Sequence, residues 1–154
     1  MASEIKQGTL EFVNHLPILQ VITPMLIAPI LVVLNNKTLS WLLSFLGALA
    51  CLFISILLIQ AVSDGSILTY YLGGWVPPIG IEYRIDAANA ILLFLISIIS
   101  AIVLIFSYSS LNAEIPEEKH TLFYSCFLLC LTGLLGVVAT ADIFNVFVFL
   151  EISS

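Results

Sequence analysis

Charged side chains are scarce in this chain. Of its 154 residues, 9% are charged and 61% are hydrophobic, and the mean hydropathy is +1.18. A soluble domain carries about 25% charged residues, so this composition excludes a domain with a polar surface and predicts a chain surrounded by lipid. Only 4 residues are Lys or Arg, too few for the basic surface that binds a nucleic-acid backbone. We therefore expect the lipid bilayer, and no nucleic acid, among its partners.

Cysteine and histidine, the usual metal ligands, are also rare, at 3 and 2 residues. Cys51, Cys126 and Cys130 all lie in apolar runs, where they fit as small packing residues. No His or carboxylate is spaced to complete a metal site with the last two, so we expect no metal and no cofactor. The sequence also shows no nucleophile–base pair and no Gly-rich phosphate loop, which argues against an enzyme.

Long uncharged stretches make up most of the chain, at residues 16–36, 38–63, 87–113 and 121–141. A helix needs about 20 apolar residues to cross a ~30 Å hydrocarbon core. We predict an all-α polytopic membrane protein with four transmembrane helices plus the start of a fifth. The expected organisation is an N-terminal segment 1–15 and a transmembrane bundle 16–154, with spans near 17–35, 39–62, 87–108 and 120–141 and a partial span 142–154.

The basic residues do not decide the orientation in the membrane. Lys6 and Arg84 fall on one side of the predicted topology, and Lys37 and Lys119 fall on the other. The positive-inside rule compares such loops and here finds a tie. The predicted topology places the connection 63–86 on the same side as the N-terminus. The location that the composition supports is a multi-pass protein of the cell membrane.

Small residues recur along single faces of three predicted helices. The stripes are Ser40, Ser44, Gly47, Cys51 and Ser55; Asp86, Asn89, Ser97, Ser100 and Ser107; and Ser125, Thr132, Gly133, Gly136 and Thr140. Small side chains at this spacing allow another helix to approach closely. We expect helix packing at these stripes, with a polar pathway along them as the alternative.

The connection 63–86 is rich in glycine and proline. Gly73, Gly74, Pro77, Pro78 and Gly80 prevent a continuous helix there. Residues 81–86 alternate apolar and polar side chains, which predicts a short extended segment. We expect an ordered cap over the bundle.

The last residues carry a carboxylate into an apolar helix. Asp142 suits the start of that helix, because its charge favours the positive end of the dipole. Glu151 follows nine residues later, or ~13.5 Å along the helix, which is close to the middle of a ~30 Å core. Such a carboxyl group either carries protons or makes a hydrogen bond between helices.

Two segments resemble a known family, the antiporter-like membrane subunits. One is Tyr71 to Ile81 with its Gly-Gly-Trp-Val-Pro-Pro core, and the other is Ala141 to Glu151 with Asp142, Asn145 and Glu151. The family includes the D-type subunits of Mrp-type multisubunit Na+/H+ antiporters, the proton-pumping membrane subunits of NADH:quinone oxidoreductase, and relatives in energy-converting hydrogenases. The resemblance covers residues 65–154 and is nearest to the Mrp D-type subunits.

The resemblance implies roles for particular residues. Glu151 corresponds to the essential glutamate of the family's fifth helix, which pairs with a lysine on the seventh helix. Asp142, Asn145, Asp86, Asn89, Gly47 and Gly136 are expected to have structural or helix-packing roles, together with Gly73, Gly74, Trp75 and Pro77 of the connection. The partner lysine and the rest of the relay would lie beyond Ser154, so we expect an N-terminal piece of an incomplete antiporter-like domain.

Three functions remain open at this point. The first is a subunit of a multisubunit antiporter that exchanges protons for Na+ or another monovalent cation, alongside other membrane subunits. The second is a proton-translocating membrane subunit of NADH:quinone oxidoreductase or an energy-converting hydrogenase. The third is a non-transporting, truncated remnant that only packs against partners.

Overall fold

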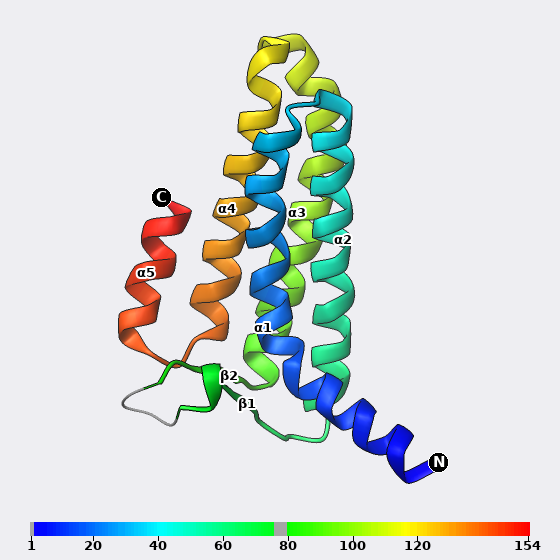
Figure 1. Cartoon of the computed structure of the whole chain (residues 1–154), viewed down its shortest axis with the longest axis vertical. Helices are drawn as coiled ribbons and strands as arrows, with labels where there is room; N and C mark the ends of the chain where they lie inside the picture. The colour runs from blue at the N-terminus through cyan, green and yellow to red at the C-terminus, as the bar shows by residue number, and fades with distance from the viewer. Residues whose placement is uncertain (1, 76–79) are drawn as a thin grey trace.

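The computed structural model describes residues 2–75 and 80–154, apart from the side chains of residues 2–7, 9 and 10. Four long helices run antiparallel in a bundle: α1 (Ala2–Leu34), α2 (Lys37–Val62), α3 (Ala87–Glu114) and α4 (His120–Ala139). A short fifth helix, α5 (Ile143–Ser153), packs beside α4 (Figure 1). Each long helix contains a stretch long and apolar enough to cross a membrane. The predicted all-α, multi-pass membrane fold is therefore confirmed.

Two helices extend well beyond their predicted spans. α1 begins at Ala2, fifteen residues before the predicted start at 17, and it continues through Pro17, Pro24 and Pro29. α3 continues past residue 108 to Glu114. It ends there because Pro116 disfavours a helical backbone at Ile115, which is extended at φ −123° and ψ 137°.

The connection between α2 and α3 folds into a β-hairpin. Strand β1 (Leu68–Tyr71) pairs antiparallel with β2 (Glu82–Ile85), with Leu68 opposite Ile85 and Tyr71 opposite Glu82. The extended segment predicted at 81–86 is thus present, whereas its partner β1 was not predicted. A 3₁₀ turn, η1 (Leu72–Gly74), follows β1. The hairpin lies at the end of the bundle where α1 begins, as the predicted topology requires (Figure 1).

The small-residue stripes lie inside the bundle. α2 buries Ser40, Ser44, Gly47, Cys51 and Ser55, α3 buries Ser97, Ser100 and Ser107, and α4 buries Ser125, Thr132, Gly133 and Gly136. At Gly47, a Cβ atom would come within 2.8 Å of Ile27 Cδ1 on α1. Large apolar side chains point outward instead, Val33 being 84% exposed and Phe106 69% exposed. This inside-out pattern is the one expected where the solvent is lipid.

At the opposite end of the bundle, polar side chains form an ion pair and hydrogen bonds around the turn between α3 and α4. Lys37 Nζ forms an ion pair with Glu117 Oε1 at 2.7 Å, joining the start of α2 to the 3₁₀ turn η2 (Glu117–Lys119). Just beyond, His120 is buried, and its Nε2 lies 2.8 Å from the Ile115 carbonyl oxygen. These contacts close the turn between α3 and α4.

Candidate functional site

The carboxylate Asp142 starts helix α5. Its Oδ1 accepts a hydrogen bond from the Phe144 N–H at 3.1 Å, so Asp142 is the N-cap that its position predicts. A capping carboxylate satisfies an otherwise free N–H of the first turn and favours the helix dipole. The start of α5 therefore follows from local chemistry.

α5 approaches α4 through two glycines. The Phe149 ring lies directly against Gly136, where an added Cβ would collide with it, and Ser153 lies against Gly133. Phe149 itself is 6% exposed. The glycines bring the two helices close together because they have no side chains to hold them apart.

Glu151 points away from the bundle. It is exposed, and its helix face also carries Phe144 (72% exposed) and Phe147 (66% exposed). Among the side chains that the structure describes, no basic group forms an ion pair with Glu151. α5 ends about halfway along the bundle (Figure 1). The carboxylate is thus presented on an apolar surface that four packed helices leave uncovered.

Asn145 lies on the opposite face of α5, at a buried junction with the hairpin. Its Nδ2 donates a hydrogen bond to Thr140 Oγ1 at 3.2 Å, and its side chain lies beside that of Tyr83 on β2, with which it lines one cavity. Thr140 also forms a β-bridge with Tyr83. The Ala141 N–H donates to the Glu82 carbonyl oxygen at 2.9 Å. Strand β2 thereby continues onto the link between α4 and α5.

Tyr83 contributes a ring as well as a hydroxyl group to this junction. It is 5% exposed, and its ring centroid lies 6.4 Å from that of Phe149. Burial raises the pKa of Tyr83 above its ordinary value, and the neighbouring Asn145 side chain partly offsets the rise. The hydroxyl therefore stays protonated and available as a donor at neutral pH. The alternation of residues 81–86 marks Tyr83 as inward-facing, but the sequence does not reveal that it contacts α5.

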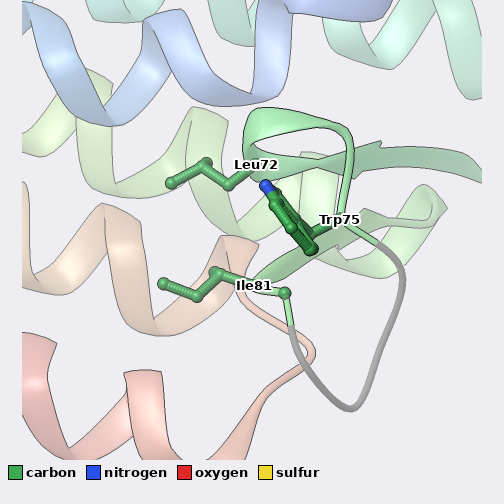
Figure 2. A pocket seen from close by; sticks show the side chains of 4 residues that line it. Leu72, Trp75 and Ile81 are labelled. Atoms are coloured by element: carbon green, nitrogen blue, oxygen red, sulfur yellow. The ribbon is translucent and has the colours of Figure 1, made fainter.

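The remaining motif residues lie in the hairpin and at its exit. Gly73 and Gly74 have φ of 68° and 76°, a left-handed backbone that glycine adopts without strain. Trp75 is 63% exposed, and with Leu72 and Ile81 it lines a cavity of about 340 Å³ (Figure 2). Pro77 lies outside the described residues.

Asp86 and Asn89 act at the start of α3. Asp86 Oδ1 accepts a hydrogen bond from the Asn89 N–H at 2.9 Å, and Asn89 Nδ2 donates to the Arg84 carbonyl oxygen at 3.0 Å. Asp86 is exposed. The packing stripe predicted along α3 therefore does not extend to these two residues, because their side chains cap the helix instead.

A buried polar cluster, which we call the Gln20 cluster (Gln20, Ser55 and Ser97), joins α1, α2 and α3. Gln20 is 0% exposed, and its Nε2 donates to Ser55 Oγ at 2.8 Å and to Ser97 Oγ at 3.2 Å. Gln20 Oε1 has no hydrogen-bond partner among the described residues. The two serines belong to the stripes predicted from the sequence, whereas Gln20 was not predicted, although an amide within an otherwise apolar span is itself a signal. Within the described residues, no group of three or more His, Cys, Asp or Glu side chains could hold a metal ion.

The four apolar helices and the lipid-facing surface define a multi-pass membrane protein. No protein-family profile matches the chain. It is similar to the N-type subunit of NADH-quinone oxidoreductase from Desulforudis audaxviator, at 37% identity over 143 residues, which is 91% of this chain and 28% of that protein. It is also similar to the D-type subunit of the Na(+)/H(+) antiporter from Alkalihalophilus pseudofirmus, at 30% identity over 140 residues, which is 90% of this chain and 28% of that protein.

Two solved structures share the fold. A chain of the membrane-bound sulfane sulfur reductase, an archaeal respiratory membrane complex, aligns with a TM-score of 0.80 and 32% identity, over 89% of this chain and 28% of that one. A chain of the Mrp complex from Dietzia sp. DQ12-45-1b aligns with a TM-score of 0.79 and 22% identity, over 92% of this chain and 26% of that one. The chain spans between a quarter and a third of the length of these relatives. Over that shared region, the chain is similar to the antiporter-like membrane subunits.

Proposed function

We propose that this chain is part of a membrane subunit of a multisubunit antiporter, which exchanges protons for Na+ or another monovalent cation, and that Glu151 carries the proton. The observation that bears most weight is the position of Glu151. It is a carboxylate about 13.5 Å along an apolar helix from the cap Asp142, on a face that the described residues leave uncovered. A carboxylate in such surroundings needs a partner, a water-filled cavity or a proton, which makes it suited to proton transfer.

The uncovered face also suggests how the site is completed. By resemblance to the family, the partner of Glu151 is a lysine on another transmembrane helix. A helix that brings a basic side chain to this face would cover Phe144 and Phe147 and pair with the carboxylate in one contact. The remaining partners would be other membrane subunits of the complex.

A second candidate is a proton-translocating membrane subunit of a respiratory complex. Two relatives favour it: the NADH-quinone oxidoreductase relative is 37% identical, and the respiratory complex chain is 32% identical with a TM-score of 0.80. Both candidates use Glu151 in the same way and differ in the neighbouring subunits. Purification of the native complex distinguishes them, because flavin or iron–sulfur subunits would accompany only the respiratory form.

The test of Glu151 is a substitution in the protein as it occurs in its membrane complex. Glu151→Gln keeps the shape and a polar tip but removes the titratable proton. We expect it to abolish cation-driven pH change in membrane vesicles while the complex still assembles. Glu151→Asp should keep part of the activity, because the acid survives on a shorter side chain.

Asp142→Asn is the matched control on the same helix. Its loss is mainly a capping and dipole contribution of about 0.3–1 kcal/mol, so transport should fall far less than in Glu151→Gln. Transport at the wild-type rate in Glu151→Gln would refute the assignment and leave Glu151 as a structural hydrogen-bonding residue.

A further inference from the structure

Two glycines hold α5 close to α4 but present no side chain that fixes its rotation. At Gly133 and Gly136, the surface of α4 lacks a Cβ ridge that could lodge in a groove of α5. Ridges packed into grooves are what normally fix one helix against another. Here the groove lies on α4 and the ridge on α5, because the Phe149 ring fills the space at Gly136. Contacts of this face of α5 with other elements can then hold the ring in that groove.

The other contacts that can fix the rotation of α5 are those with the hairpin. Asn145 is buried, hydrogen-bonded to Thr140 and adjacent to the Tyr83 side chain, and four residues later Phe149 packs against the Tyr83 ring. Residues i and i+4 lie on one face of a helix. Tyr83 thus faces two successive turns of α5 on the same side, next to Asn145 on one and packed against the Phe149 ring on the other.

Glu151 lies on the other side because of this setting. Successive residues in a helix turn by about 100°, so Glu151 is about 200° from Phe149. With Asn145 and Phe149 held inward by Tyr83, the carboxylate faces outward, as its exposure shows. If α5 rotated about its axis, the carboxylate would no longer point outward from the bundle.

We propose that Tyr83 is a positioning residue for Glu151: by engaging Asn145 and Phe149, the hairpin acts together with the contact at Gly136 to set the rotation of α5 and thereby the direction of the carboxylate. This inference rests on the proposed function only for its effect on transport. Tyr83 reaches no reacting group itself. Its hydroxyl and ring act through α5, and the backbone bond from Ala141 to Glu82 keeps β2 in place for both contacts.

The test compares three variants in the complete protein within its native membrane complex. Tyr83→Leu removes both the ring and the hydroxyl, and Tyr83→Phe keeps the ring contact with Phe149. Tyr70→Leu is the matched control, because Tyr70 lies directly opposite Tyr83 on β1 and its ring packs against His15. Infrared difference spectroscopy follows the carboxyl bands of Glu151, identified as the bands lost in Glu151→Gln.

We expect Tyr83→Leu to shift the Glu151 bands and to lower cation-driven transport about tenfold or more, since small displacements of a reacting group cost up to about 10²-fold. Tyr83→Phe should recover most of the transport, and Tyr70→Leu should leave the bands unchanged. Equal band shifts in Tyr70→Leu and Tyr83→Leu would overturn the proposal, because they would indicate general loosening of the hairpin. Unchanged bands in Tyr83→Leu would also overturn it.

These outcomes are separate from those of the proposed function. If Glu151→Gln transports normally, Glu151 is not the proton carrier, yet a band shift confined to Tyr83→Leu would still support the positioning role. If Tyr83→Leu fails to assemble, the bands of Tyr83→Phe decide the question. The hydroxyl contact predicts a smaller shift in the same direction, and identity with the wild type would refute that contact.

Discussion

The buried side-chain amide of Gln20 donates two hydrogen bonds through Nε2, but its oxygen Oε1 accepts none among the described residues. Its partners do not depend on it. Ser55 Oγ also donates to the Cys51 carbonyl oxygen, and Ser97 Oγ donates to the Leu93 carbonyl oxygen, each at 2.8 Å. Removing the amide would therefore leave no hydroxyl without an acceptor. The contribution of Gln20 to stability thus depends on its volume more than on its polarity.

A pair of substitutions at Gln20 separates these contributions. Gln20→Leu keeps most of the volume and should change the free energy of unfolding by less than about 1 kcal/mol, since hydrogen bonds between membrane helices average about 0.6 kcal/mol. Gln20→Ala should cost about 2 kcal/mol or more, because it leaves a cavity. Unfolding in mixed micelles measures both values. A larger loss in Gln20→Leu than in Gln20→Ala would contradict this account.

At the scale of single elements, the contact between α4 and α5 depends on the absence of side chains. Gly136→Leu should separate the two helices, because Phe149 already occupies the space that a side chain would need. Cys126→Leu is the control on α4, since it introduces the same side chain at an exposed position. We expect Gly136→Leu to lower the yield of assembled complex strongly and Cys126→Leu to leave it unchanged. Equal assembly of the two variants would show that Gly136 does not mark a close contact.

Elements with a strong local signal could be predicted from the sequence. The four spans, the cap Asp142 and the extended segment at 81–86 each depend on neighbouring residues, through hydropathy, capping or alternation. β1 escaped prediction because its residues Leu68–Tyr71, Leu-Thr-Tyr-Tyr, do not alternate clearly between apolar and polar side chains as those of β2 do. The Gln20 cluster and the Tyr83–Asn145 junction also escaped, because they join residues far apart in the chain.

At the scale of the whole molecule, the antiparallel bundle places the loops between its helices at two opposite ends. Asp64, before the hairpin, and Glu114, at the end of α3, lie at opposite ends of the bundle and are both exposed. In a protein with its natural cysteines replaced, Asp64→Cys and Glu114→Cys should react with an impermeant thiol reagent from opposite sides of the membrane. Modification of both from one side in intact vesicles would exclude this topology.

The bond between β2 and the link into α5 has a consequence for biosynthesis. Synthesis proceeds from the N-terminus, so α1 to α4 and the hairpin leave the ribosome before α5. The hairpin that contacts the start of α5 is therefore already synthesised when that helix leaves the ribosome. The first turns of that helix, from Ile143 onward, are by themselves too short to form a stable helix in water. The new segment can thus become helical and take up its orientation in one step, as it docks on a strand synthesised some sixty residues earlier. The backbone hydrogen bond from Ala141 to Glu82 joins the two.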